Sequence, residues 1–172
     1  MFKNLVSGIN ESIKVIKGSY NLGRSGGFAS YINSLNISYE MKDEDGFIVL
    51  TDDTVVYGSG FTGACTTMLQ FGNWFHNEMV PVIFLTEEFA SLPRLVKTYI
   101  ILHEKGHHVL GHINGGMKKR NIEKEIEADL YAVSKLGKEN VIAAMKIFGQ
   151  NNLHGKGNRE MKKRIQAIKD RA

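Results

Sequence analysis

The chain has 172 residues, of which 42% are hydrophobic and 23% are charged, and its formal net charge is +4. A chain of this length builds one sizeable core but is short for two, so we expect a single domain over residues 1–172. Its composition is ordinary for a globular protein, and its longest unbroken apolar run, residues 141–145, is far too short to span a bilayer, which excludes the membrane-embedded classes.

Two further features bear on the cellular compartment. Residues 1–8 contain no apolar stretch of the kind found in secretory signals. The single cysteine, Cys65, cannot form an internal disulfide, and a lone cysteine among small residues is usually a buried filler. We therefore expect a cytoplasmic protein.

The first half of the chain predicts a helix, a loop and a β-hairpin. In residues 1–17, apolar side chains recur at helical spacing, which predicts an amphipathic N-terminal helix. Residues 18–27 contain four glycines and predict a loop that lacks the lysine ending of a phosphate-binding loop. Residues 47–57 predict a hairpin with two aspartates at its turn, whereas residues 62–76 fit either a helix or a strand.

Residues 80–85, with the sequence Val-Pro-Val-Ile-Phe-Leu, predict a β-strand. Proline has no N–H to donate, so Pro81 is admissible only at the start of a strand or at the edge of a sheet. We therefore expect residues 82–85 to form an edge strand with unpaired N–H and C=O groups on one side.

The next predicted helix carries the pattern His-Glu-x-x-His at residues 103–107. Its apolar residues and both histidines follow one helical stripe, which consists of Leu92, Leu95, Val96, Tyr99, Ile100, His103, His107 and Leu110. Histidines at i and i+4 lie about 40° apart around the axis, so both imidazoles can bind one metal ion, with Glu104 beside them. Gly106 weakens a helix unless another backbone must approach closely there, and Gly111 or Gly115 is expected to end the helix.

A second helix, over residues 121–133, offers the third ligand that a two-histidine zinc site needs. Its apolar stripe consists of Ile122, Ile126, Leu130 and Val133. At about 100° per residue, Glu125 and Asp129 flank this stripe on one side, whereas Glu123 and Glu127 point elsewhere. We therefore predict that Glu125 is the ligand and that Asp129 orients a ligand from behind. The other two glutamates should be dispensable for metal binding.

Residues 138–149 and 158–170 predict a final pair of helices. Much of the positive charge lies at this end of the chain, in Lys156, Arg159, Lys162, Lys163, Arg164, Lys169 and Arg171. The apolar residues of the last segment form an inner stripe with the basic residues outside it, which favours a solvated helix face over nucleic-acid binding.

Three other histidines need a role. His108 and His112 lie about 100° and 140° round from His107, off the ligand face, so we expect them to contact solvent or to cap the end of the helix. If Glu104 activates a metal-bound water to attack a carbonyl group, a hydrogen-bond donor for the resulting oxyanion is also needed. The sequence does not choose among the candidate donors, which are Tyr131, His154 in a loop, and Arg164.

Residues 103–107, followed by Glu125-Ile126-Glu127-Ala128-Asp129, resemble the gluzincin arrangement, in which a His-Glu-x-x-His helix precedes a Glu-x-x-Ala-Asp helix. The second helix is similar to that of HtpX-type proteases and their soluble relatives, and residues 103–112 are similar to ImmA/IrrE-type peptidases. The resemblance covers about residues 80–136. It implies a zincin-like α+β domain with a small mixed sheet. It also implies one Zn²⁺ per chain, with the following site residues: ligands His103, His107 and Glu125, general base Glu104, and supporting residue Asp129.

In zincins the strand before the metal helix pairs with extended substrate, so the resemblance assigns that role to residues 82–85. The end of the chain matches HtpX-type proteins in part, because Arg164 stands at the expected spacing but Asn158-Arg159 replaces His-Pro. The resulting prediction is a zinc-dependent endopeptidase that acts on a protein or peptide substrate. The alternative is a non-catalytic, zinc-stabilised protein-binding module. The sequence names neither the substrate nor the oligomeric state.

Overall fold

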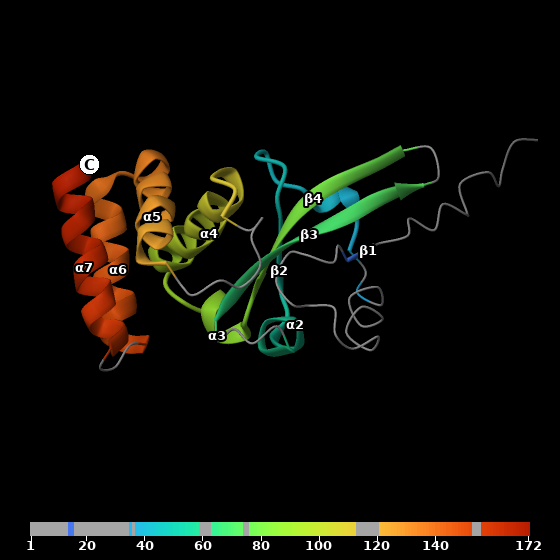
Figure 1. Cartoon of the computed structure of the whole chain (residues 1–172). Helices are drawn as coiled ribbons and strands as arrows, with labels where there is room; N and C mark the ends of the chain where they lie inside the picture. Colours follow the sequence, from blue (N-terminus) through green and yellow to red (C-terminus); the bar gives the residue numbers. More distant parts are fainter. Residues whose placement is uncertain are drawn as a thin grey trace, which may run out of the picture.

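The computed structural model describes residues 14–15, 35, 37–58, 63–73, 76–112, 121–152 and 156–172, and it has the expected α+β class (Figure 1). The strands are β1 (Lys14–Val15), β2 (Ile48–Thr51), β3 (Ala64–Asn73) and β4 (His76–Leu85). The helical elements are the 3-10 helix η1 (Tyr39–Met41), α2 (Asp53–Gly58), α3 (Glu87–Ala90), α4 (Arg94–Val109), α5 (Ile122–Leu136), α6 (Lys138–Asn152) and α7 (Lys156–Arg171). Helices α4 to α7 gather at one end of the molecule, and the β3–β4 hairpin extends away at the other (Figure 1). Within the described ranges, no helix has both the length and the apolar character to cross a membrane.

The sheet is small and mixed, with the strand order β1-β3-β4-β2. β3 and β4 form an antiparallel hairpin, and β2 runs parallel to β4. Residues 82–85 of β4 therefore pair with β2 on one side and with β3 on the other, so the prediction that they form an edge strand is wrong. Pro81 lies within β4, one residue before the segment that β2 joins, which keeps a residue without an N–H out of the doubly paired part.

The unbroken apolar run of β4 reflects two cores, one on each face of the sheet. Ile83 and Leu85 pack in one cluster with side chains of α4, α5, α6 and α7. Val82 and Phe84 point to the opposite face, where they join a second cluster that includes Val55 of α2. A strand buried on both faces shows no polar alternation, so its composition alone does not separate a central strand from an edge strand.

The predicted hairpin over residues 47–57 is wrong in its second half, because α2 follows β2 in place of a strand. The carboxylate of Asp52 accepts a hydrogen bond from the N–H of Val55 at 2.8 Å, and its backbone carbonyl accepts one from Val56 at 3.3 Å. Asp52 thus starts a helix where a turn was expected. Both valines are fully buried in the second cluster, and this burial outweighs their preference for strands.

The N-terminal predictions fall largely outside the described residues. Of the helix predicted over residues 1–17, only Lys14 and Val15 are described, and they form β1, paired antiparallel with β3, so the helix does not extend through them. The loop predicted over residues 18–27 lies outside the described residues. The ambiguous residues 62–76 contain β3, which resolves them in favour of a strand.

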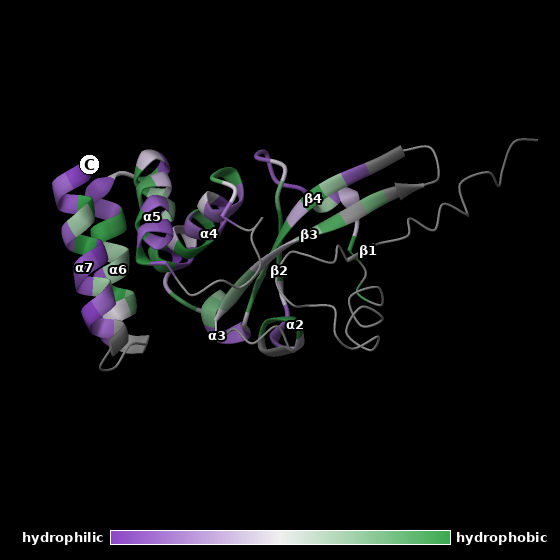
Figure 2. Cartoon of the chain, viewed as in Figure 1, coloured by the Kyte–Doolittle hydropathy of each residue, from purple (hydrophilic) through white to green (hydrophobic). Residues whose placement is uncertain are grey.

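The helices of the second half are confirmed, with ends that differ by a few residues from those predicted. In α7, Met161 and Ile168 are buried against the helix-side core, whereas Lys162 and Lys163 are exposed. α7 is therefore amphipathic, and much of its visible surface is hydrophilic (Figure 2). This is the arrangement expected of a solvated basic face, except at Arg164, which is buried although it was expected outside the inner stripe.

Candidate metal centre

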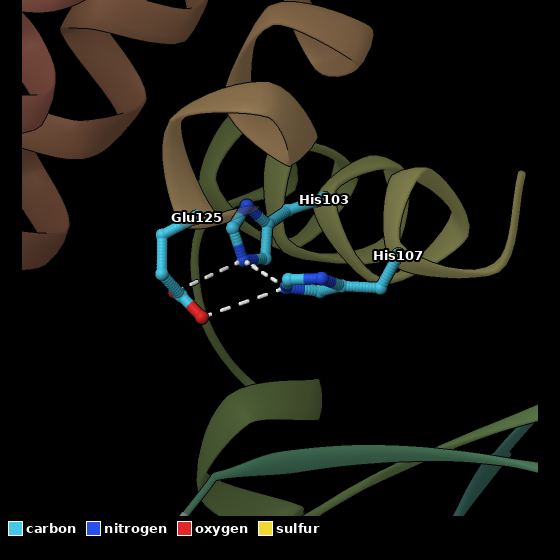
Figure 3. Close-up of side chains that lie close together, drawn as sticks. All are labelled: His103, His107 and Glu125. Carbon is cyan, nitrogen blue, oxygen red and sulfur yellow. Dashed lines mark hydrogen bonds and ion pairs between the residues drawn. The ribbon is translucent and has the colours of Figure 1, made fainter. Parts of the chain in front are cut away.

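Three side chains that can ligate a metal lie together where α4 meets α5, namely His103 and His107 of α4 and Glu125 of α5 (Figure 3). Their ligand atoms all lie within 4.8 Å of one another. The two Nε2 atoms are 3.1 Å apart; that of His103 lies 3.5 Å from Oε2 of Glu125, and that of His107 lies 3.7 Å from Oε1. A tetrahedral ion with bonds of about 2.0–2.1 Å keeps its ligands about 3.3–3.4 Å apart, so this group fits such an ion.

Both histidines lie on the buried stripe of α4 that its periodicity predicts. Each is only 8% exposed, and the stripe continues through Val96, Tyr99 and Ile100, which are also buried. Gly111 has a φ of 69°, the left-handed conformation in which glycine ends helices, and α4 stops two residues earlier. Of the two glycines expected to end this helix, Gly111 is therefore confirmed, and Gly115 lies outside the described residues.

At Gly106 the backbones of α4 and α5 are in close contact. A Cβ added there would lie 3.0 Å from the Cα of Ala128 and 3.1 Å from the Cβ of Tyr131. This is the close approach that a glycine in mid-helix predicts. Glu125 precedes Ala128 by less than one turn, so the contact holds its carboxylate within reach of the histidines. Tyr131, one of the three candidate oxyanion donors, packs at this same contact.

Asp129 lies behind His103, where the periodicity of α5 predicts it. Its carboxylate is fully buried, and one oxygen lies 2.9 Å from Nδ1 of His103 and accepts a hydrogen bond from the hydroxyl of Tyr99 at 2.8 Å. A carboxylate is an acceptor, so the Nδ1 of His103 carries the proton of this bond. That arrangement leaves Nε2, which faces His107 and Glu125, as the ring nitrogen that can bind a metal ion once it has lost its own proton.

Arg164 of α7 completes the arrangement. Its Nε and Nη2 donate to Asp129 at 2.7 Å and 2.6 Å, its Nη1 donates to Glu125 at 3.2 Å, and its Nη2 also donates to the Tyr99 hydroxyl at 3.1 Å. The sequence presents Arg164 as a candidate oxyanion donor. These contacts favour a different role, because a buried guanidinium that donates to two carboxylates holds the ligand residues in place.

The charges of the cluster are strongly coupled. Burial alone would lower the pKa of His103, but hydrogen bonds to Asp129 and Glu125 outweigh burial and raise it to about 9. His107 shows the opposite shift, because burial and the neighbouring His103 lower its pKa to about 3. Burial would raise the pKa of Glu125, yet the hydrogen bond with His103 and the charge of Arg164 help to lower it to about 2. At neutral pH the cluster therefore holds a charged His103, a neutral His107 and an ionised Glu125.

The remaining histidines differ from expectation. The ring of His108 packs edge-on against Phe47, with ring centroids 5.5 Å apart, and its Nε2 lies against the hydroxyl of Thr66 on β3. Burial lowers the pKa of His108 to about 4. The backbone N–H of His112 does bond to the end of α4, but its side chain turns back onto His107. Both residues keep some exposure to solvent, as expected, but their rings also pack within the fold, which the expectation of solvent contact or helix capping did not include.

The structure describes Glu104 as a partly buried residue of α4, next in the chain to the first ligand. His154, the loop candidate for an oxyanion donor, lies outside the described residues. Comparison of the chain with protein-family models, with curated proteins and with solved structures finds no match in any of the three.

Replacing Gly106 by alanine should weaken metal binding while the chain still folds. The new Cβ meets backbone atoms of Ala128, which cannot rotate away, so α5 must shift and carry Glu125 off the histidines. We expect a loss of Zn²⁺ affinity on the order of tenfold, equivalent to about 1.4 kcal/mol, measured by competition with a chromogenic chelator.

The matched control is Gly149→Ala in α6, where the new Cβ would meet Cγ of Met161 at 3.5 Å, an ordinary contact. This variant should keep its Zn²⁺ affinity and gain up to about 1 kcal/mol of stability from helix propensity. Equal affinities for Gly106→Ala and the wild type would show that the spacing of α4 and α5 does not set the site.

Metal binding should release a proton from His103. Because its pKa is raised to about 9, a metal ion must displace that proton at any lower pH, whereas His107 is already neutral and Glu125 already ionised. Zn²⁺ affinity should therefore rise about tenfold per pH unit between about pH 6 and pH 8, with release of about one proton per ion. Isothermal titration calorimetry in buffers of different ionisation enthalpy measures both quantities, and an affinity that does not change with pH would contradict this account.

Proposed function

We propose that this chain is a zinc-dependent endopeptidase of the gluzincin type. The observation that carries the proposal is the group of His103, His107 and Glu125 around one point, with Glu104 adjacent to the first ligand on the same helix. The resemblance to HtpX-type and ImmA/IrrE-type peptidases rests on these residues. No relative supports the assignment independently, so its weight lies on the geometry of the site.

Zinc suits this group by donor type and by spacing. Two imidazole nitrogens and one carboxylate oxygen are the donors of many catalytic zinc sites, which leave a fourth position for water or substrate. Structural zinc sites are usually closed by four protein ligands, most often cysteine or histidine. Among the described residues the group has three members, which favours the peptidase over the zinc-stabilised binding module. Native mass spectrometry with and without a chelator tests the expected stoichiometry of one zinc per chain.

Each residue of the site has a separate role in the proposed hydrolysis. Bound zinc would polarise the scissile carbonyl and lower the pKa of a water molecule. Glu104, about 100° round the helix from His103, takes the proton of the attacking water and delivers it to the amine of the leaving fragment. Asp129 and Arg164 hold His103 and Glu125 in their ligand orientations. The oxyanion donor is proposed from outside this network, with Tyr131 and His154 as the remaining candidates.

The substrate and location follow from the same proposal. We assign a protein or peptide substrate, because a peptide carbonyl is the group that this chemistry attacks. The two families that the sequence resembles differ in how they select their substrates. An ImmA-type peptidase would cut one protein target at one place, and an HtpX-like protease would cleave unfolded chains loosely. The buried, unbridged thiol of Cys65 supports a reducing, cytoplasmic location.

The role of Glu104 can be separated from that of the ligands. Glu104→Gln should bind Zn²⁺ like the wild type but hydrolyse peptides about 10²–10⁴-fold more slowly, because an amide cannot accept the proton. His103→Ala and Glu125→Ala should lose the metal itself. Cleavage of unfolded protein and of peptide libraries, together with metal analysis of each variant, measures both effects.

The matched control is Glu139→Gln on α6, which makes the same chemical change at an exposed position outside the site. This variant should retain full activity. Activity of Glu104→Gln within a few-fold of the wild type would rule out the proposed mechanism. A zinc-loaded wild type that cleaves none of these substrates would favour the binding module.

A further inference from the structure

The second histidine ligand has a supporting chain of its own. Nδ1 of His107 lies 3.0 Å from Nδ1 of His112, and Nε2 of His112 lies 3.0 Å from an oxygen of Glu127 on α5. The side chain of His112 is only 6% exposed, whereas that of Glu127 is 49% exposed. This series of hydrogen bonds therefore runs from the buried His107 to the surface through the covered imidazole of His112.

The end of α4 brings His112 to this position. The N–H of Gly111 donates to the carbonyl of His108 at 3.0 Å, and the N–H of His112 donates to the carbonyl of His107 at 2.9 Å. With Gly111 at a φ of 69°, these bonds form a Schellman motif, which folds the residue after the glycine back over the last turn. The Nζ of Lys124 on α5 also donates to the carbonyl of His112 at 3.4 Å.

The direction of the hydrogen bonds follows from the acceptor at the far end. The carboxylate of Glu127 accepts, so the Nε2 of His112 donates to it and its Nδ1 is left as an acceptor. The Nδ1 of His107 must then be the donor in its bond to His112. A neutral histidine with its proton on Nδ1 presents a lone pair on Nε2, and Nε2 is the atom that faces Glu125 in the ligand group.

We propose that His112 and Glu127 are positioning residues for His107, which select its tautomer and fix its ring for metal binding. The inference rests on the proposed metal site, and it gives His107 a counterpart to the support that Asp129 provides for His103. It also revises an expectation from periodicity, in which Glu127 points away from the site and is dispensable for metal binding. Glu127 acts at a distance, through His112.

Two amide substitutions of His112 test the proposal. The side chain of asparagine places its amide near the position of the imidazole Nδ1, and that of glutamine near Nε2. Because Nδ1 contacts His107, His112→Asn can still accept the hydrogen bond from the ligand, whereas His112→Gln reaches towards Glu127 alone. We expect His112→Ala and His112→Gln to lose about 10–100-fold in Zn²⁺ affinity, and His112→Asn to recover most of that loss.

Glu127→Gln tests the outer end of the chain. The amide is a weaker acceptor than a carboxylate, so we expect a smaller loss, on the order of a few-fold. The matched control is Glu123→Gln on the same helix, which removes an exposed ion pair with Arg171 and should leave the Zn²⁺ affinity unchanged.

Two measurements separate positioning from folding. Zn²⁺ affinity comes from chelator competition without any substrate, and the imidazole ¹⁵N shifts of His107 in chelator-treated protein report its tautomer. The Nδ1–H form should dominate in the wild type and in His112→Asn, and the Nε2–H form should become populated in His112→Gln. Thermal unfolding of the same samples shows whether the two amide variants are equally folded.

The proposal is overturned if His112→Ala binds Zn²⁺ like the wild type, or if the asparagine and glutamine variants are equally weakened with no change of tautomer. The latter result would mean that His112 only fills space. The outcome is independent of the proposed peptidase activity. If the His112 variants differ in Zn²⁺ affinity as expected but the protein cleaves no substrate, this inference stands and the proposed function is rejected. If the wild type cleaves peptides but all the His112 variants bind Zn²⁺ equally, the function stands and this inference is rejected.

Discussion

The candidate site depends on one buried charge, the carboxylate of Asp129. Its partners are the guanidinium of Arg164, the imidazole of His103 and the hydroxyl of Tyr99. Burial alone would raise the pKa of Asp129, but the bonds from Arg164 and His103 hold it well below its usual range. Breaking a buried pair of this kind costs about 3–5 kcal/mol, because the remaining charge stays desolvated. Since the partners come from α4 and α7 and Asp129 from α5, one charge ties three helices together at the ligands.

The two variable positions of the His-Glu-x-x-His pattern also have structural roles. Lys105 is buried, and its ammonium lies 2.6 Å from a carboxylate oxygen of both Asp43 and Asp45, in the turn before β2. Burial would lower the pKa of Lys105, but the two carboxylates raise it above its ordinary value. The next residue, Gly106, lies against the backbone of α5. One turn of α4 therefore joins the sheet side of the molecule to the helical side, and the ligands lie at that junction.

The two candidate histidine ligands are held by different means. His103 is bonded to a buried, charged network and carries a raised pKa, whereas His107 is bonded to a second imidazole, that of His112, and has a lowered pKa. The network around His103 is shielded by three helices. The support of His107 ends at a half-exposed carboxylate, that of Glu127, so it lies nearer to solvent. The two candidate ligands are equally buried, and they differ in how far their supporting groups lie from solvent.

The local pattern of the sequence determined the helices and the ligand group. His103 and His107 share a face because i and i+4 positions do so in any α-helix, and Glu125 stands out from its neighbouring acids by the same geometry. The helices α4 to α7 and residues 80–85 of β4 were predictable because periodicity, apolar runs and end signals are carried by adjacent residues. Gly106 was informative for a related reason, since a glycine in mid-helix needs a nearby backbone to explain it.

Tertiary structure decided the features that depend on contacts between residues distant in the sequence. Residues 82–85 form a central strand because β2 joins their open side, and residues 53–58 form a helix because burial outweighs strand preference. The guanidinium of Arg164 lies behind the ligands because α7 packs on α5, a contact that no spacing in the sequence encodes. His112 meets His107 only because the chain reverses at Gly111 and α5 places Glu127 opposite. Helical spacing fixes the direction of a side chain from its own axis, and the packing of whole elements decides what that side chain meets.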